Sequence, residues 1–278
     1  MGDLKDKSFN QGTYDGVKLY ANANSKSYKY YKPANGDKAT DDDRYDAMKA
    51  AVDNGAEVVV AAGFLQAAAL QKAATEFTDT KFVFIDGSPV DGLTNLAAIS
   101  FREEQCGYLA GYAAVMEGYT KLGFLGGMAV PAVVRYGFGY VQGVDAAAKE
   151  LGITVDLKYA YGNQFVGDAD ITAAMDTWYQ GGTEIVFACG GGIYTSAAEA
   201  AAKVGGKIIG VDVDQAGIID GDYGEGMTVT SAMKGLAPTV KHLLSEVVAG
   251  NFANYGGKIE TLGLVSANPE ENLSLIHI

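Results

Sequence analysis

Histidine, cysteine and proline are scarce in this chain, and these scarcities argue against several classes of function. The 278 residues include 2 His, 2 Cys and 5 Pro. Cys106 and Cys189 lie far apart and form no CxxC pair, so we expect neither a metal centre nor a dithiol redox site. His242 falls in a predicted amphipathic helix and His277 near the C-terminal end, which leaves no credible Ser/His/Asp set. We therefore expect no enzyme, no metal and no cofactor.

Basic residues are fewer than acidic ones. The chain has 21 Lys and Arg and 34 Asp and Glu, which gives a formal net charge of −13. Because nucleic-acid binding depends on clustered Lys and Arg, we expect no nucleic-acid partner, and the charge favours a neutral or cationic ligand. No apolar run is long enough to cross a bilayer, and the first residues lack the basic and apolar stretches of a secretory signal.

The two ends do not fit the pattern of the chain between them. Only Met1–Lys5 precede a motif that should follow a β-strand, so the first strand is expected to be missing. The apolar hexapeptide at 273–278 follows a polar turn abruptly and matches the translation of a transposon end used in sequencing libraries. We expect a gene fragment that is truncated at both ends and carries a non-native tail at 273–278.

Glycine and alanine are abundant, and they alternate with Val/Ile/Phe runs in a pattern typical of helices between buried parallel strands. The second half of the chain repeats the pattern of the first, which predicts an α/β protein with two lobes, 1–101 plus 233–250 and 102–232 plus 251–272. Strands are predicted at 28–31, 57–63, 81–86, 96–101, 121–125, 154–161, 184–188, 207–211 and 228–235, with a last crossing at 256–265. Helices are predicted at 10–23, 41–54, 64–77, 102–118, 131–151, 168–180, 193–204 and 236–249.

Aromatic, acidic and glycine residues follow these strands, where open α/β sheets bind ligands. Two aromatic rings could stack on a flat ligand, carboxylates could accept hydrogen bonds, and glycines let the backbone approach closely. The same residues could instead be core aromatics, helix-capping aspartates and a surface lysine. The glycine run lacks the Lys and Ser/Thr of a P-loop. The candidates are Phe9, Asn10, Asp86, Met128, Phe165, Gly190–Gly192, Asp212 and Lys234.

Four dispersed motifs in a fixed order resemble the basic membrane protein family, the substrate-binding lipoproteins of ABC importers, and within it the purine nucleoside receptors. The resemblance extends over essentially all of Asp3 to Asn272. The motifs are Asp6-Lys7-Ser8-Phe9-Asn10-Gln11-Gly12, Phe101-Arg102-Glu103-Glu104-Gln105 leading to Gly107-Tyr108-Leu109-Ala110-Gly111, Gly126-Gly127-Met128 before Pro131, and Gly210-Val211-Asp212-Val213-Asp214-Gln215.

The resemblance implies how a purine base would be held. Phe9 and Phe165 would stack on the two faces of the ring. Asn10 and Asp86 would form hydrogen bonds with its polar edge. This arrangement suits a flat heterocycle that presents N–H donors and ring acceptors at its rim.

The resemblance also implies contacts with the sugar. Asp212 would accept hydrogen bonds from the ribose hydroxyls, and Lys234 would donate to the sugar or hold Asp212. Because an acidic cleft should repel phosphate, the expected ligand is an unphosphorylated nucleoside: inosine, guanosine or adenosine. The remaining wall would be formed by Met128, Val166 and Gly191.

The implied fold is the type I periplasmic-binding fold, with two Rossmann-like lobes whose hinge closure traps the ligand. The implied partner is an ABC transporter permease, and the implied location is extracytoplasmic, either lipid-anchored or periplasmic. The family's first strand, lipid-modified cysteine and last elements are not represented in this sequence. Two alternatives stay open: a receptor for a sugar or other small solute on the same fold, and a nucleoside-processing enzyme.

Overall fold

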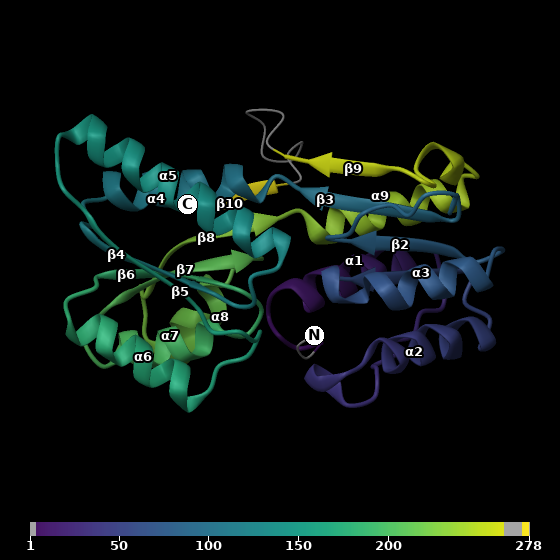
Figure 1. Ribbon diagram of the computed structural model, residues 1–278, viewed down its shortest axis with the longest axis horizontal. Coiled ribbons are helices and arrows are strands. Elements are labelled where there is room, and N and C mark those ends of the chain that lie inside the picture. Colours follow the sequence, from purple (N-terminus) through teal and green to yellow (C-terminus); the bar gives the residue numbers. More distant parts are fainter. Residues whose placement is uncertain (1–3, 264–273, 278) are drawn as a thin grey trace. The chain divides into compact units, whose positions relative to one another are not determined.

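The computed structural model describes residues 4–263 and 274–277, which form two compact units. Unit 1 consists mainly of Asn10–Phe101 and Leu236–Leu262, and unit 2 mainly of Lys5–Phe9 and Arg102–Gly235. Each unit is a sheet of mostly parallel strands covered by helices (Figure 1). No helix among the described residues combines the length and apolar character needed to cross a membrane.

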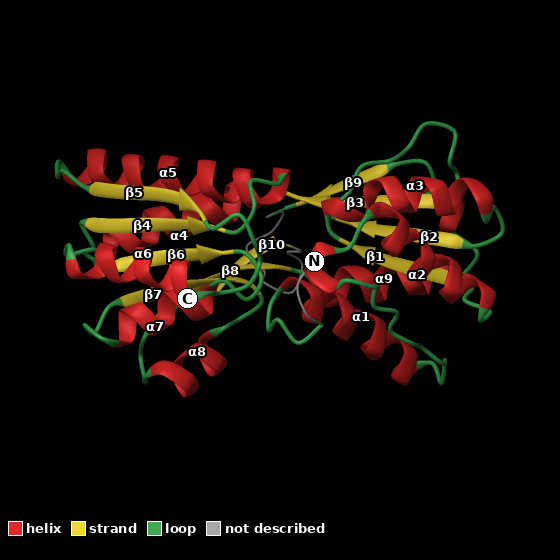
Figure 2. Cartoon of the chain, turned by 60° about the horizontal axis from the view of Figure 1, so that its bottom comes forward, coloured by secondary structure: helices red, strands yellow, loops and turns green. Residues whose placement is uncertain are grey.

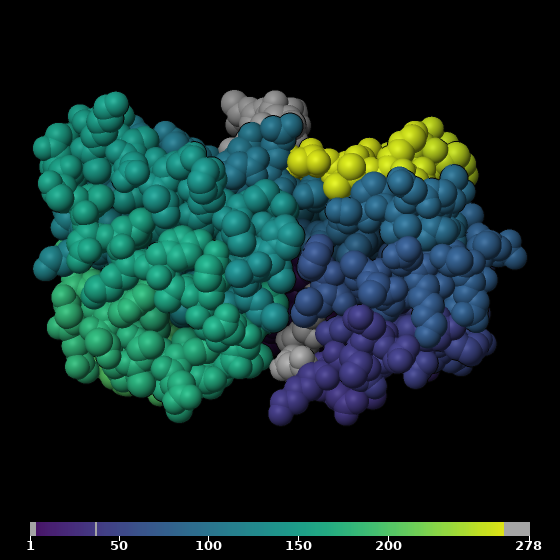
Figure 3. Space-filling model, in the orientation of Figure 1, coloured from purple at the N-terminus to yellow at the C-terminus, as the bar shows by residue number. Residues whose placement is uncertain are grey.

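The sheet of unit 1 has the order β1-β2-β3-β9, and all of its strand pairs are parallel. The inner strands are apolar almost throughout, as expected for strands covered on both faces. The strands are β1 (Val58–Ala62), β2 (Lys81–Ile85), β3 (Leu96–Phe101) and β9 (Ile259–Leu262), and the helices are α1 (Phe9–Ala23), α2 (Asp41–Asp53), α3 (Ala67–Glu76) and α9 (Leu236–Val248). The yellow atoms of β9 and its neighbours form part of the surface of unit 1, as befits an edge strand (Figure 3).

Helix α2 begins where the sequence predicts, because its first turn is capped. The Thr40 hydroxyl accepts a hydrogen bond from the Asp43 amide at 3.2 Å, and the Asp43 carboxylate accepts one from the Thr40 amide at 2.7 Å. This reciprocal capping box satisfies two amide groups that a helix start otherwise leaves unpaired. The helix packs Tyr45 and Met48 against Leu70 and Phe82 in the core of unit 1.

The sheet of unit 2 has the order β10-β8-β7-β6-β4-β5, parallel except for the β10–β8 pair. Residues on both faces are buried in two clusters, one built on α4 and α5 and the other on α6, α7 and α8. The strands are β4 (Lys121–Gly126), β5 (Asp156–Tyr161), β6 (Ile185–Cys189), β7 (Lys207–Asp212), β8 (Thr228–Lys234) and β10 (Ser274–His277). The helices are α4 (Glu103–Met116), α5 (Pro131–Leu151), α6 (Ala169–Gln180), α7 (Tyr194–Ala202) and α8 (Ala216–Tyr223).

Glycines let α4 and α5 pack with their backbones in contact. A Cβ atom added at Gly107 or Gly111 of α4 would lie 2.1 or 2.3 Å from a carbonyl oxygen of α5. One added at Gly139 or Gly143 of α5 would lie 2.1 or 1.9 Å from a carbonyl oxygen of α4. The contact is therefore reciprocal, because glycines of each helix lie against the backbone of the other.

The structure corrects several sequence predictions. The predicted strand at 28–31 pairs with no strand in the described part of the chain, although its backbone belongs to no helix either. Helix α8 was not predicted. Residues 251–262, assigned to the second lobe, belong to unit 1 because β9 pairs with β3. Lys5–Phe9 and residues 233–235, which include Lys234, were assigned to the first lobe but belong to unit 2.

The predicted non-native tail forms a strand over part of its length. Ser274–His277 form β10, antiparallel to β8, while residues 273 and 278 lie outside the described residues. Residues 264–272, predicted as the end of the second lobe, lie outside them too. The origin of the tail stays a prediction.

Candidate functional site

The carboxyl ends of five parallel strands meet at one edge of the unit 2 sheet. In Figure 2 the arrowheads of β4, β5 and β6 point the same way, and loops gather beyond them. Neighbouring strands are about 4.8 Å apart, so residues that follow adjacent strands are near neighbours. Seven predicted site residues belong to unit 2: Phe9, Met128, Phe165, Val166, Gly191, Asp212 and Lys234.

Asp212, the last residue of β7, is a buried carboxylate with a hydroxyl partner. Its side chain accepts a hydrogen bond from the Ser8 hydroxyl at 2.6 Å, and only 5% of the residue is exposed. Its backbone has φ 68°, a left-handed conformation that Asp tolerates better than most residues. The strand thus ends in a turn that directs this carboxylate into the protein.

The segment before α1 is tied to the same strand end. The Ser8 amide donates to Asp6 Oδ1 at 3.0 Å, and Gln215 Nε2 donates to the Lys7 carbonyl at 3.0 Å. Gln215 is fully buried, and its Oε1 accepts from the Val211 amide at 2.9 Å. These bonds explain why Phe9 belongs to unit 2 although α1 continues into unit 1.

Lys234, at the end of β8, joins an acidic partner and an aromatic ring. Its Nζ lies 3.1 Å from Glu103 Oε1 and 4.9 Å from the centre of the Phe9 ring. Lys234 is 4% exposed and Glu103 0%, while Arg135 reaches the other Glu103 oxygen from α5. The ammonium group is thus fixed beside Phe9, where a cation–π contact adds to the ion pair.

The ring of Phe165 packs against glycines that follow β4 and β6. A Cβ at Gly127 would lie 2.6 Å from its ring, and one at Gly190 would lie 3.2 Å from it. Gly191 has φ 55°, and the Gly192 amide donates to the Phe165 carbonyl at 2.8 Å. Val166 pairs with Gly192 in an isolated bridge, so these loops hold the half-buried Phe165 in place.

The two other predicted residues belong to unit 1. Asn10 lies in the first turn of α1, and Asp86 directly follows β2. Asp86 has φ 57°, so both units place an aspartate in left-handed conformation at the end of a sheet strand. Whether Asn10 and Asp86 bind a ligand stays a prediction.

Burial raises the pKa of Asp212 above its ordinary value of 3.8, and the nearby Asp6 and Glu103 charges add to this, while Lys234 and the Ser8 hydrogen bond lower it. When the pKa of a carboxyl group is higher in the folded than in the unfolded protein, the folded protein loses stability as pH rises above the pKa of the unfolded state. Charged Asp212 therefore destabilises the ligand-free protein at neutral pH.

We expect Asp212→Asn to raise the melting temperature of the ligand-free protein at pH 7. Asn removes the buried charge, keeps an acceptor for Ser8 and tolerates the left-handed backbone. The gain should shrink as pH falls toward 3.8, where the wild-type carboxyl is also protonated. Thermal unfolding of both proteins from pH 4 to 8 measures it, and an equal or lower melting temperature at pH 7 would contradict the pKa direction.

Sequence reasoning missed the polar residues that hold the candidates in place. Ser8, Glu103 and Gln215 all fall within the motifs noted above, but none of them was predicted to support the site. Their partners are far away in the sequence. Ser8 bonds Asp212, 204 positions away; Glu103 pairs with Lys234, 131 positions away; and Gln215 bonds Lys7, 208 positions away. A buried residue's distant partner is not visible in a single sequence, although the presence of a charged residue at the start of an otherwise apolar helix was a signal.

Comparisons with known proteins agree with this architecture. A family model described as "ABC transporter substrate-binding protein PnrA-like" matches residues 1–267. The "ABC transporter nucleoside-binding protein BmpA" of Lactococcus lactis subsp. cremoris (strain MG1363) is 29% identical over 282 residues, which cover 94% of this chain and 76% of that protein. "Basic membrane protein A" of Borreliella burgdorferi (strain ATCC 35210 / DSM 4680 / CIP 102532 / B31) is 28% identical over 286 residues, covering 97% and 78%.

Solved structures confirm the fold. An ABC transporter solute-binding protein from Aeropyrum pernix K1 superposes with a TM-score of 0.79 at 23% identity, covering 95% of this chain and 72% of that one. The periplasmic binding protein of the arabinose ABC transporter from Shewanella sp. ANA-3 gives 0.66 at 14% identity, covering 94% and 87%. The predicted type I periplasmic-binding fold is therefore confirmed. These relatives are solute-binding proteins rather than enzymes, and such importer components work outside the cytoplasm. The chain belongs to the PnrA-like family of ABC transporter substrate-binding proteins.

Proposed function

We propose that this protein binds a purine nucleoside and delivers it to the permease of an ABC importer. The observation that supports this most is the group formed by Asp212, Lys234 and Phe9. It combines a buried hydrogen-bond acceptor, a fixed cation and an aromatic ring, the chemistry that a ribose and a flat base require. The nucleoside-binding name of the Lactococcus relative points the same way.

In this proposal the ribose hydroxyls donate to Asp212. Such bonds would replace part of the hydration that its buried carboxylate has lost, so the ligand would compensate for the unfavourable burial of the charge. Lys234 either donates to the sugar or holds Asp212 in place. A phosphate group would meet Asp212 and Glu103 as like charges, so nucleotides should bind more weakly than nucleosides.

The base is proposed to lie between Phe9 and Phe165, with its polar edge bonded to Asn10 and Asp86. Met128, Val166 and Gly191 would complete the wall. Because these contacts draw on residues of both units, the ligand would favour the conformation in which it reaches all of them, which is hinge closure. Delivery to a membrane permease also leads us to propose that the natural protein is lipid-anchored or periplasmic.

Calorimetric titration with inosine, guanosine, adenosine, ribose and galactose tests the proposal. We expect saturable binding of at least one purine nucleoside and no comparable response to the free sugars. Sugar binding without a nucleoside response would favour the alternative, a sugar or small-solute receptor, which the shared fold of the arabinose-binding protein keeps open. Formation of hypoxanthine from inosine would instead favour an enzyme.

We expect Asp212→Ala to weaken nucleoside binding at least about tenfold, because one or two charge-assisted hydrogen bonds are worth about 1.5–3 kcal/mol each. Alanine in the left-handed backbone costs about 1–2 kcal/mol of folding stability, so circular dichroism must show that the variant remains folded. Asp212→Asn is the matched control, since it keeps the shape and removes the charge. Unchanged affinity in both variants would remove the ribose assignment.

A further inference from the structure

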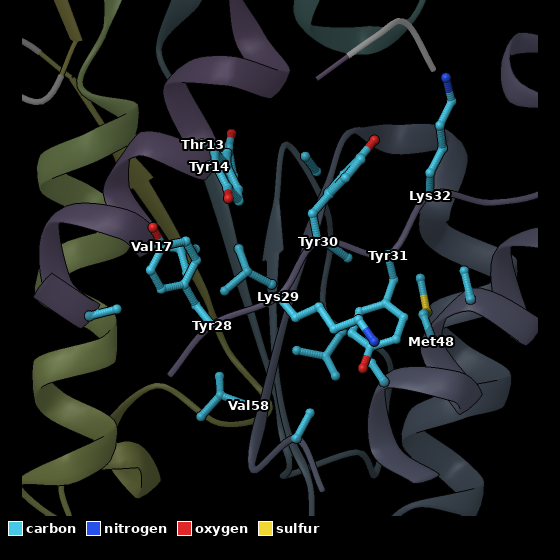
Figure 4. A pocket seen from close by; sticks show the side chains of 18 of the residues that line it. Thr13, Tyr14, Val17, Tyr28, Lys29, Tyr30, Tyr31, Lys32, Met48 and Val58 are labelled. Carbon is cyan, nitrogen blue, oxygen red and sulfur yellow. The ribbon is translucent and has the colours of Figure 1, made fainter. Parts of the chain in front are cut away.

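Strand β5 lies at one end of the unit 2 sheet, and its outer edge is open. Among the described residues it pairs only with β4 (Figure 2). It has six residues, whereas the other strands at the ends of the two sheets, β1, β9 and β10, have five, four and four. The open edge of β1 differs, because the side chains of Tyr28, Tyr30 and Tyr31 line a groove beside it (Figure 4). A long open edge is a place where another strand can add.

The backbone groups of β5 point alternately to its two sides. The amides of Asp156 and Gly162 donate to backbone carbonyls in and next to β4, at 2.8 Å each. Even-numbered residues of β5 therefore bond to β4, and the amides and carbonyls of Leu157, Tyr159 and Tyr161 point away from it. A further strand on this side would find a donor and an acceptor at every second residue.

Apolar side chains flank this open edge. Gly139 packs on α4, so Val134 and Phe138, on the opposite side of α5, face the β5 side of the sheet. Tyr159 lies under α5, where a Cβ at Gly137 would meet its hydroxyl oxygen. Phe138 is 63% exposed, the largest value for a large apolar side chain in the described chain, and Val134 is 41% and Tyr159 40% exposed. Exposed apolar groups beside an open strand indicate a contact surface.

We propose that the open edge of β5 pairs antiparallel with β5 of a second copy of this chain, which joins two unit 2 sheets into one. A two-fold axis makes such a contact self-complementary. With the axis at Tyr159, this residue lies opposite its own copy, and Leu157 lies opposite Tyr161 of the other copy. All outward-pointing residues then form hydrogen-bonded pairs, and each pair exchanges two hydrogen bonds.

The charges of β5 favour the same register. Asp156 and Lys158 are its only charged residues. In the proposed register they lie opposite Gly162 and Ala160 of the other copy. An axis at Lys158 would instead place two lysines directly opposite each other, which is unfavourable. The Lys158 ammonium is also bound within its own copy, 3.1 Å from the Thr183 hydroxyl.

The register also brings apolar side chains together. Leu157 and Tyr161 pack against the core cluster that α5 covers, and Tyr159 stacks on Phe124 of β4 on the same face, with ring centres 4.5 Å apart. The pairs across the new contact are therefore tyrosine with tyrosine and leucine with tyrosine. Aromatic and apolar cross-strand pairs of this kind stabilise antiparallel strands.

The α5 helices of the two copies would lie side by side on the joined sheet. Helix α5 lies over β4, because a Cβ at Gly137 would lie 2.9 Å from the Phe124 ring. Three strand spacings separate the two β4 strands, so the helices would be about 14 Å apart. Close-packed helices are about 8–10 Å apart, which leaves space for Val134 and Phe138 of both copies between them. The exposed apolar side chains of one copy would thus become buried.

The net charge of the chain determines the conditions in which this dimer forms. Each copy carries −13, so two copies repel each other at low ionic strength. Salt screens this repulsion, while backbone pairing and apolar burial remain. We expect the dimer to become about fivefold or more tighter when salt is raised from about 0.05 to 0.5 M.

Sedimentation equilibrium of the full chain, from low to high micromolar concentration, tests the proposal. We expect a monomer–dimer equilibrium that Phe138→Lys weakens by about tenfold or more, because it places like charges between the copies. Phe64→Lys is the matched control. Phe64 is 45% exposed and belongs to unit 1, so the same chemical change there should leave the dimer unaffected.

Cysteine cross-linking tests the register. Oxidised Tyr159→Cys should link two copies, because the Cα atoms of a hydrogen-bonded antiparallel pair are about 5.5 Å apart, within reach of a disulfide. Tyr161→Cys should not, because residue 161 of each copy would lie four positions, or about 13 Å, from its counterpart. Cys106 and Cys189 are buried and do not compete.

Three outcomes would overturn the proposal. The first is a monomer at every concentration and salt, and the second is a dimer that Phe138→Lys leaves unchanged or that links equally through both cysteine variants. The third is a dimer in which amide hydrogen exchange slows in Val58–Ala62 rather than at Leu157, Tyr159 and Tyr161, which would assign the contact to β1. Because no nucleoside is used, these results are independent of the proposed function.

Discussion

Replacing Gly143 by alanine should lower the free energy of unfolding of unit 2 by about 3 kcal/mol, near the upper end of what overpacking costs. The new Cβ would lie 1.9 Å from the Tyr108 carbonyl oxygen and 2.7 Å from its carbon. Both are backbone atoms of α4, so no side chain can rotate away to make room. Relief requires the two helices to separate, which opens the core around Tyr136 and Tyr140.

Gly217→Ala is the matched control for this variant. It makes the same chemical change in helix α8, where an added Cβ would meet nothing within 4 Å. Alanine in a helix is favoured over glycine by up to about 1 kcal/mol, so the control should be neutral or slightly stabilising. Thermal unfolding should show that Gly143→Ala lowers the melting temperature by roughly 6–12 °C. A Gly143 variant as stable as the Gly217 variant would contradict the close packing of α4 and α5.

The same helix pair shows how far the sequence leads. The glycines of Gly107-Tyr108-Leu109-Ala110-Gly111 were visible as a motif, and the helices at 102–118 and 131–151 were predicted to within two residues of α4 and α5. That the two glycine-bearing faces meet was not predictable, because contact between distant helices depends on the packing of the whole sheet. Strand positions were predictable because buried strands have long apolar runs.

The errors of the sequence analysis also have physical causes. Helix α8 contains Gly217 and Gly221, which weaken the helical pattern, and its neighbours in unit 2 support it instead. The strand at 28–31 was inferred from side-chain pattern, but a strand exists only when another strand accepts its hydrogen bonds. The lobe of residues 251–262 was misassigned because the last crossing can return to either sheet, and the β3 edge was free to receive β9.

For the candidate site, the sequence led to the groups at the strand ends but not to their supports. Asp212 and Lys234 were predicted as ligand contacts, and the structure brings both to adjacent strand ends, with Lys234 beside Phe9. Glu103 was not singled out. It is fully buried, and its carboxylate connects Lys234 of β8 with Arg135 of α5. Replacing Glu103 should therefore have a large effect on folding stability.

Glu103→Gln should lower the free energy of unfolding by about 3–5 kcal/mol, because it removes the carboxylate charge that lies 3.1 Å from the buried Lys234 ammonium. The side chain of Lys234 is only 2% exposed, so water cannot take over the role of the carboxylate. Arg135 is 35% exposed and can be solvated, so Lys234 should account for most of the loss. Chemical denaturation of the variant and the wild type measures the difference.

The double variant Glu103→Gln/Lys234→Met separates stability from binding. Removing both charges should restore much of the stability, since an apolar replacement of a buried ion pair is often neutral. If Lys234 contacts the ligand as proposed, the double variant should bind nucleoside more weakly than the wild type although it is folded. A double variant as unstable as Glu103→Gln alone would show that Glu103 acts chiefly through Arg135. A stable double variant that binds nucleoside like the wild type would contradict the proposed contact between Lys234 and the ligand, because affinity would then not depend on the Lys234 charge.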